Sequence, residues 1–170
     1  MYKNYIFLDY DGVVVNSEKK VKDLIKISNP KTQDEWKVFF DNINWKKVFE
    51  ESTSINNSVE IIKELENMKK NLVILTKIHT LKEAQEKVYD IRERRKIKLP
   101  IMLVPPHVNK YQIYIPSNNE TLIDDSQKNI DFWVSNNGNG ILFDEDCKAE
   151  TKNKVKSLEF LLKEECWFEK

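Results

Sequence analysis

Two aspartates one residue apart, Asp9 and Asp11, follow an apolar run near the start of the chain and precede Gly12. Because side chains alternate along a strand, both carboxylates can face the same side. Gly12 allows a sharp turn and brings the backbone close to whatever lies between the acids. Two such carboxylates repel each other unless a cation, a shared proton or a ligand offsets the repulsion. The spacing therefore favours a metal and phosphate site, although an Asp-Gly turn alone is also typical of ordinary hairpins.

Polar side chains also follow two later apolar runs. The run at 72–75 ends in Thr76, and the run at 121–123 ends in Asp124 and Asp125. Ligands of parallel sheets bind beyond the carboxyl ends of the strands, so these side chains are expected to meet. Taken alone, Thr76 could simply cap a helix. The acidic pair could likewise lie at the start of the next helix, where acidic side chains are favourable. Three strand ends with such groups predict one shared site.

The elements that must position these groups alternate along the chain. Five apolar runs are typical of buried strands: 5–8, 72–75, 101–104, 121–123 and 141–143. Amphipathic segments lie between most of them. Short, wholly apolar strands that alternate with amphipathic helices predict an α/β fold, with a Rossmann-like, three-layer arrangement in which helices cover both faces of a parallel sheet.

Residues 17–55 contain helix signals and no strand signal, so a small helical cap is expected there, inserted into a core formed by 1–16 and 56–170. A capping box at Thr32 to Glu35 opens one of its two or three short helices. Its aromatic residues most simply form the core of the cap. Alternatively, one or two of them line a substrate pocket and stack on a base or sugar. These residues are Trp36, Phe39, Phe40, Trp45 and Phe49.

Further helices are expected after the second and fourth strands and at the end of the chain. Thr80 to Glu83 is another capping box, and Ser126 is expected to cap a helix that Gly138 and Gly140 close. The last predicted helix is marked by three apolar residues, Val155, Leu158 and Leu162.

Composition excludes several classes of partner. The 28 basic and 28 acidic residues give no net charge, so nothing favours nucleic acid or an anionic membrane. No apolar run approaches the roughly 20 residues that span a bilayer, and the start of the chain does not resemble a signal peptide. Cys147 and Cys166 have no metal-ligand spacing and are expected to be free thiols of a cytoplasmic protein. The oligomeric state is left open.

Together, these motifs resemble the signatures of the haloacid dehalogenase-like (HAD-like) superfamily of phosphatases and phosphotransferases. Its Asp-x-Asp-Gly-Val motif stands at 9–13, its strand-end threonine is Thr76, and its acidic pair is Asp124 and Asp125. The resemblance covers the chain except 17–55. An insertion at this point is similar to the small cap of compact members, including the 5′(3′)-deoxyribonucleotidases. The resemblance implies a HAD-like phosphoric monoester hydrolase.

The remaining signature of the superfamily is a lone lysine ahead of the acidic pair. Lys110 is the best match by position, although its gap to Asp124 is short and no helix clearly carries it. Lys77, beside Thr76, and Lys128, after the acidic pair, are alternatives. The need for a cation at the phosphate favours Lys110.

The resemblance implies a Mg²⁺-dependent reaction in which Asp9 attacks phosphorus and forms an aspartyl-phosphate that water hydrolyses. Asp9, Asp124 and a backbone carbonyl, that of Asp11, would hold the Mg²⁺, with Asp125 acting through water or orienting the site. Asp11 would act as general acid and then as general base. The dehalogenases of the superfamily lack this second acid, so its presence argues for phosphoester chemistry.

Thr76 would donate its hydroxyl to a phosphoryl oxygen, and Lys110 would supply positive charge. His79 and His107 are expected to have no catalytic role. The expected substrate is a small phosphorylated molecule such as a nucleotide or a sugar phosphate. Two alternatives remain: a phosphotransferase or mutase that passes the phosphoryl group to another acceptor, and a non-catalytic, regulatory domain that binds phosphate.

Overall fold

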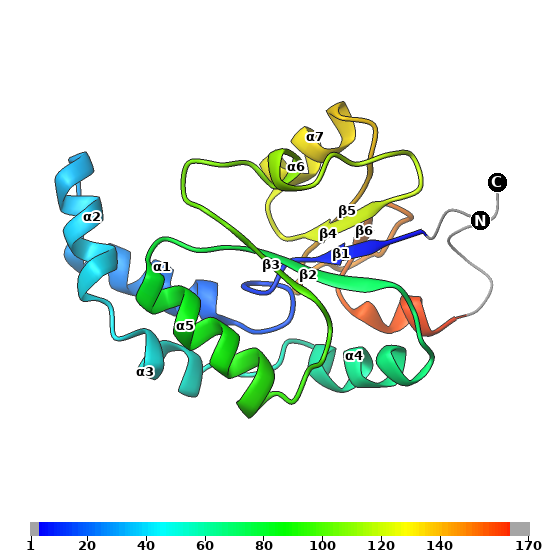
Figure 1. Ribbon diagram of the computed structural model, residues 1–170, viewed down its shortest axis with the longest axis horizontal. Helices are drawn as coiled ribbons and strands as arrows, with labels where there is room; N and C mark the ends of the chain where they lie inside the picture. Colours follow the sequence, from blue (N-terminus) through cyan, green and yellow to red (C-terminus); the bar gives the residue numbers. More distant parts are fainter. Residues whose placement is uncertain (1–3, 164–170) are drawn as a thin grey trace.

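The computed structural model describes residues 4–163 and shows a wholly parallel, six-stranded sheet between two layers of helices (Figure 1). The strands lie in the order β3-β2-β1-β4-β5-β6. They are β1 Ile6–Leu8, β2 Leu72–Lys77, β3 Ile101–Val104, β4 Thr121–Asp124, β5 Asn139–Phe143 and β6 Lys154–Val155. The predicted α/β, Rossmann-like fold is confirmed, and the strand order reverses between β1 and β4, where such sheets bind ligands.

The strands are continuous apolar runs because both faces of the sheet are buried. Side chains alternate along each strand, so neighbouring residues enter different hydrophobic cores. Phe7 and Leu122 belong to one core together with Trp133, whereas Leu8 and Ile123 belong to the other.

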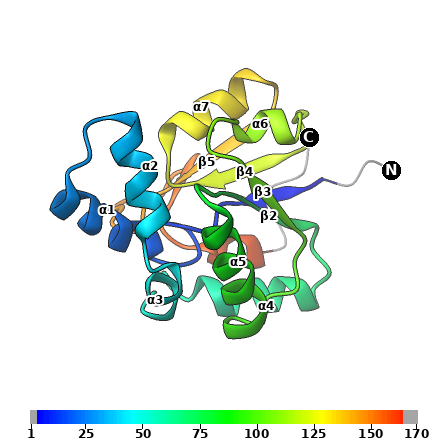
Figure 2. The same cartoon turned by 60° about the vertical axis from the view of Figure 1, so that its left-hand side comes forward.

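Helices cover each face of the sheet (Figures 1 and 2). On one face lie α6 Lys110–Ile113 and α7 Gln127–Ser135. On the other lie α4 Ser58–Asn67, α5 Leu81–Tyr89 with a π-helical turn η1 Asp90–Arg94, and the 3-10 helix η2 Leu158–Leu162. None of the helices among the described residues is long and apolar enough to span a membrane.

Residues 17–55 form three helices beside the edge where β1 ends, at the left of Figure 1. They are α1 Ser17–Ser28, α2 Gln33–Asn42 and α3 Trp45–Glu50. The predicted capping box is present, since the Glu35 N–H bonds Thr32 Oγ1 at 3.2 Å and the Thr32 N–H bonds Glu35 Oε2 at 3.1 Å. The chain leaves and rejoins the sheet at adjacent points, where the Asn16 N–H donates to the Thr53 carbonyl at 3.1 Å.

The aromatic residues of this segment are only partly a core. Trp45 and Phe49 are buried, but α2 has no fully buried residue, so Trp36, Phe39 and Phe40 keep some exposure. The rings nevertheless pack on one another, and Phe39 and Phe40 lie against the core that contains Trp45 and Phe49, so the expected aromatic core is present but only partly buried in α2.

The predicted last helix is present only in part, as the 3-10 helix η2 from Leu158 to Leu162, and its expected start at Val155 is wrong. Lys154 and Val155 form strand β6, which pairs with Leu142 and Phe143 of β5, and only the residues that follow turn into η2. A strand of two residues, one of them charged, carries no apolar run by which the sequence could reveal it.

The predicted end of α7 is also corrected. Gly140 does not close the helix but lies within β5. A Cβ there would lie 2.5 Å from Ile130 Cγ2, so this glycine lets α7 pack closely on the strand. Cys147 is a buried free thiol, and the prediction for Cys166 lies outside the described residues.

Candidate active site

Three carboxylates converge at the carboxyl ends of β1 and β4. Asp9 follows β1, Asp124 ends β4 and Asp125 follows it. One oxygen from each lies within 4.8 Å of the others. The two strands are parallel neighbours with Leu8 opposite Ile123, and this register brings together acids that are far apart along the chain. The predicted convergence of these acids is present.

The Lys110 ammonium lies between two of these carboxylates. Its Nζ is 2.9 Å from Asp9 Oδ1 and 2.6 Å from Asp124 Oδ2. Burial alone would lower the pKa of Lys110. The negative charges of Asp124 and Asp9 have the larger effect and raise this pKa above its usual value. The lysine is therefore a fixed positive charge beside the candidate nucleophile.

The other two candidate lysines make no such contact. Lys77 lines the same cavity, and burial together with the charge of Lys110 lowers its pKa. The Lys128 ammonium lies 5.8 Å from the centre of the Phe132 ring. Of the three lysines, the structure brings only Lys110 to the acids.

Lys110 is the first residue of α6, a short helix that was not predicted from the sequence. The Asn109 N–H donates to Gln112 Oε1 at 2.8 Å, which is one half of a capping box. The Asn-x-x-Gln pattern was visible in the sequence and could have located this helix and its lysine.

Asp124 is fixed on its other side by α7. Its Oδ1 accepts the Ser126 N–H at 2.8 Å, and the Asn129 side-chain amide lies 3.1 Å from both of its oxygens. Ser126 holds the N-cap position as predicted, but its side chain makes no capping bond. Asn129 was not predicted to belong to the site.

Crowding changes the acidity of this cluster. Burial raises the pKa of Asp9 to about 7, with Asp124 and Asp11 adding to the rise and Lys110 opposing it. Burial also raises the pKa of Asp125 to about 9, helped by the charge of Asp9 and a hydrogen bond with Glu18. A divalent cation among these oxygens would relieve the repulsion, and hard carboxylate oxygens suit Mg²⁺.

Asp11 has a different set of partners. Lys87 Nζ lies 2.5 Å from its Oδ2, the Thr76 hydroxyl donates to the same oxygen at 3.2 Å, and the Ser17 hydroxyl donates to Oδ1 at 2.5 Å. Burial alone would raise the pKa of Asp11, but Lys87 and these hydrogen bonds outweigh it and lower the pKa. Thr76 is fully buried, and its hydroxyl is directed at Asp11 in this structure.

Lys87 was not predicted to belong to the site. It lies on α5 at helical spacing from Ala84 and Ile91, both of which are buried. A charged residue at a core-facing position was the available signal, but a lysine at such a spacing is normally read as part of the solvated face.

A cavity of about 160 Å³ lies over these groups. Asp9, Asp11 and Lys110 line its core side. Glu18 and Val21 of α1 and Trp45 of α3 line it from the inserted helices. Residues far apart in the sequence therefore enclose one small, charged space.

His79, for which no catalytic role is predicted, also lines this cavity. Its ring stacks on Phe40 of α2, with centroids 3.9 Å apart and an interplanar angle of 9°. This contact joins the inserted helices to the end of β2. The structure places neither His107 nor Cys147 in the lining of the cavity.

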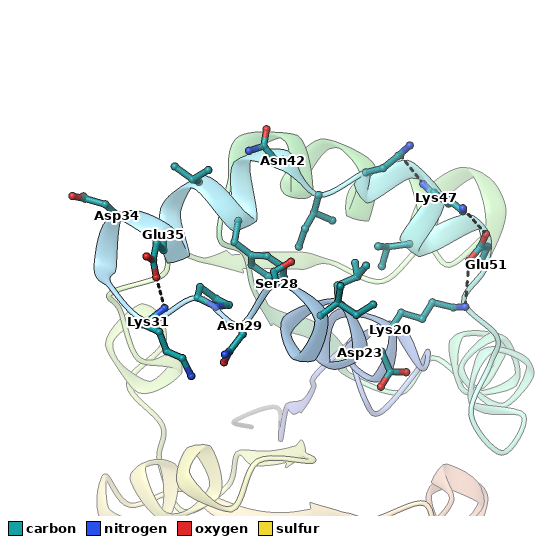
Figure 3. A pocket seen from close by; sticks show the side chains of 18 residues that line it. Lys20, Asp23, Ser28, Asn29, Lys31, Asp34, Glu35, Asn42, Lys47 and Glu51 are labelled. Atoms are coloured by element: carbon teal, nitrogen blue, oxygen red, sulfur yellow. Dashed lines mark hydrogen bonds and ion pairs between the residues drawn. The ribbon is translucent and has the colours of Figure 1, made fainter.

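A larger cavity, of about 1,030 Å³, lies between α1, α2 and α3 and is shown in Figure 3. Its lining includes the apolar residues Leu24, Ile27 and Val38 and contains none of the candidate site residues. The candidate active site is therefore identified by the charged side chains that line the smaller cavity, and not by the volume of the cavity.

Gly12 makes room for Asp125. Its φ is +83°, a backbone conformation that L side chains rarely adopt, and an added Cβ would lie 2.4 Å from Asp125 Oδ2. Gly12→Ala is therefore expected to destabilise the protein by about 1–3 kcal/mol, because the backbone is strained and the carboxylate must move. Urea unfolding measures the first effect and Mg²⁺ titration the second. An alanine variant with parental stability and Mg²⁺ affinity would contradict this account of the turn.

The sequence matches no family model and no curated protein. Among solved structures, 66 chains match. The HAD hydrolase YfnB from Bacillus subtilis, bound to magnesium, is similar over 95% of this chain and 97% of its own, with 13% identity and a TM-score of 0.61. A substrate-bound phosphoserine phosphatase is similar over 95% and 98%, with 15% identity and a TM-score of 0.58. A phospho-aspartyl intermediate analogue of phosphoserine phosphatase has the same coverage and identity, with a TM-score of 0.55.

These likenesses concern the fold, because identities of 13–15% are too low to carry an activity across. Together with the strand order, they define the class: the chain has the HAD-like α/β fold.

Proposed function

We propose that the protein is a Mg²⁺-dependent phosphatase of small phosphomonoesters that works through an aspartyl-phosphate on Asp9. The observation that carries the proposal is the cluster of Asp9, Asp124 and Asp125, with Lys110 between Asp9 and Asp124, beside a cavity that Asp9, Asp125 and Lys110 line. Phosphoryl transfer needs a nucleophile, neutralisation of the phosphoryl charge and a proton for the leaving group. The phosphatase with a phospho-aspartyl analogue, which has the same fold, supports this reading.

Asp9, Asp124 and the Asp11 carbonyl would hold the metal, with Asp125 bound directly or through water. When bound, Mg²⁺ supplies the charge that offsets repulsion between a carboxylate and a phosphate dianion. Lys110 adds a second positive charge, fixed 2.9 Å from Asp9. An oxygen of Asp9 then forms the bond to phosphorus as the bond to the leaving oxygen breaks.

Asp11 is proposed to move the protons. It gives a proton to the leaving oxygen and later takes one from the water that hydrolyses the aspartyl-phosphate. Its lowered pKa favours the carboxylate, which is the form needed for the second of these steps. A bound phosphate dianion would raise that pKa and so favour the protonated form needed for the first. Thr76 holds Asp11 in this structure and is also proposed to reach a phosphoryl oxygen.

The segment 17–55 is proposed to be the cap of this site, inserted into the core of 1–16 and 56–170. Helices α1 and α3 contribute Glu18, Val21 and Trp45 to the cavity wall. The aromatic contact of Phe40 with His79 supports a cap that packs on the core at the mouth of the site. Such a cap would exclude water during the reaction and select what enters.

The size of the cavity leads to a prediction about substrates. At about 160 Å³, it is smaller than the roughly 300–1,000 Å³ of sites that hold drug-sized ligands. Short phosphomonoesters such as glycerol phosphate are therefore expected to have kcat/KM at least about 10-fold higher than nucleoside monophosphates. Phosphate release from a panel of esters graded by size, with Mg²⁺ and with EDTA, measures this preference.

The same panel tests the proposed function. No hydrolysis of any ester, para-nitrophenyl phosphate included, would favour a non-catalytic phosphate-binding domain. A preference for nucleotides would contradict the size argument and leave the chemistry standing. Adding an excess of acceptor alcohol separates hydrolysis from phosphotransfer, because a transferase would release a new phosphoester in place of inorganic phosphate.

A further inference from the structure

We infer that Lys87, held by Glu83, is a positioning residue for Asp11 and acts on the proton-transfer half of the reaction. The inference rests on the proposed function, because it assigns Asp11 the proton transfers. Two buried lysines contact neighbouring aspartates from different helices. Lys110 of α6 contacts Asp9, and Lys87 of α5 contacts Asp11.

Lys87 is fully buried, and its ammonium has no donor to spare. Nζ lies 2.5 Å from Asp11 Oδ2, 3.0 Å from Glu83 Oε1 and 3.3 Å from Thr76 Oγ1, and it also donates to the Lys77 carbonyl. An ammonium has three N–H donors, and these four acceptors account for all of them. Lys87 is therefore not placed to bind a phosphate.

One side of the Asp11 carboxylate contacts the buried Lys87, and the other side faces the cavity. Its side chain is 23% exposed and lines the cavity, whereas the Lys87 side chain is 0% exposed. The two hydroxyls that also bind Asp11, from Ser17 and Thr76, can rotate about their C–O bonds. Among the described residues, Lys87 makes the one ion pair of this carboxylate, and so it sets the direction of the carboxylate edge that faces the cavity.

Glu83 fixes Lys87 in turn. Its Oε1 pairs with Lys87, while its Oε2 accepts the His79 N–H at 2.6 Å and lies 3.0 Å from His79 Nδ1. The predicted capping box at Thr80 is therefore incomplete. Thr80 Oγ1 accepts the Glu83 N–H at 3.0 Å, but the Glu83 carboxylate serves His79 and Lys87 instead of Thr80.

The element that carries Lys87 also holds the residue before Asp11. The Tyr10 hydroxyl donates to Asp90 Oδ2 at 2.5 Å, and Asp90 begins the π-helical turn that continues α5. Buried charges are costly unless they are fully paired, so an apolar residue at position 87 would be the simpler choice for a purely structural helix. A role in orienting the Asp11 carboxylate would explain why a charged residue is buried at position 87.

The test is rapid-quench kinetics of the full-length protein with Mg²⁺ on para-nitrophenyl phosphate and ethyl phosphate. Nitrophenolate leaves without an acid, whereas an alkoxide needs a proton in the transition state. With Lys87→Met, the first turnover of ethyl phosphate is expected to fall by about 10²-fold, as typical for loss of acid–base catalysis. The first burst of nitrophenolate should keep its parental rate, while the later steady state slows because Asp11 also activates water.

Three variants sharpen the result. Lys82→Met makes the same change on the exposed face of α5 and should behave as the parent protein. Lys87→Gln keeps an N–H donor and should recover part of the ethyl phosphate rate. Lys87→Met combined with Asp11→Asn should be no slower than Asp11→Asn alone, because both changes remove the same function. Equal losses on both substrates, or additive losses in the double variant, would overturn the inference.

If Lys87→Met does not fold, as judged by its melting curve, Lys87→Gln and Glu83→Gln must show the same difference between the two substrates. Parental kinetics in both would overturn the inference. Crystal structures add a readout that needs no activity: in Lys87→Gln, the Asp11 carboxylate should turn while Asp9, Lys110 and Asp124 keep their places. If the parent protein itself is inactive, the phosphatase proposal is refuted. The crystal structures would then still decide whether Lys87 positions Asp11.

Discussion

Asp9→Asn is expected to lower phosphomonoester hydrolysis by on the order of 10⁴-fold or more, as removal of a covalent nucleophile does in other enzymes. An amide oxygen is too weak a nucleophile to attack phosphorus, and the neutral side chain is also a poorer ligand for Mg²⁺. Lys110 keeps its contact with Asp124 in this variant, so the fold should survive. Initial rates on the preferred ester, with Mg²⁺ in excess, measure the loss.

The matched control is Asp131→Asn, the same change at an exposed position of α7 outside the cavity. This variant should keep parental kinetics. An Asp9→Asn protein that melts like the parent and turns over near its rate would show that Asp9 is not the nucleophile.

Chelation is the second large effect. EDTA is expected to abolish activity, and added Mg²⁺ should restore it, because the single positive charge of Lys110 does not offset three crowded carboxylates together with a phosphate dianion. The proposed site exists only in the folded protein, so Mg²⁺ is expected to bind the folded state in preference to the unfolded chain and to stabilise the fold. At 100 times its dissociation constant, the expected gain is about 2.7 kcal/mol.

Asp124→Asn should lose this stabilisation, whereas Asp131→Asn should keep it. Thermal melting at increasing Mg²⁺ concentrations measures both. Full activity in EDTA, or an equal Mg²⁺ shift in the parent and in Asp124→Asn, would contradict the assignment of the metal site.

The sheet could be predicted because its strands are buried on both faces and are therefore wholly apolar. Ile6 to Leu8 and Leu72 to Leu75 admit few other readings, and their ends had to meet at one edge. The convergence of Asp9 with Asp124 followed from that geometry. Lys110 followed from the resemblance and from the need for a cation.

What could not be predicted depends on contacts that leave no local pattern. Lys87 is buried only because Asp11 and Glu83 surround it in the folded chain. His79 lines the cavity between Phe40 of an inserted helix, which stacks on its ring, and Glu83, which lies 3.0 Å from its Nδ1. Strand β6 exists because β5 offers it an edge, and its two residues would form no strand alone.

The most direct test of the account is to identify the residue that carries the phosphoryl group. The protein is mixed with its preferred ester and Mg²⁺, quenched in acid within one turnover and treated with borohydride, which reduces an acyl phosphate of aspartate to homoserine. Peptide mass spectrometry then reads the position. Homoserine at position 9, absent from Asp9→Asn, is the predicted result. An active protein with the phosphoryl group on another residue, or with no covalent intermediate, would contradict the account.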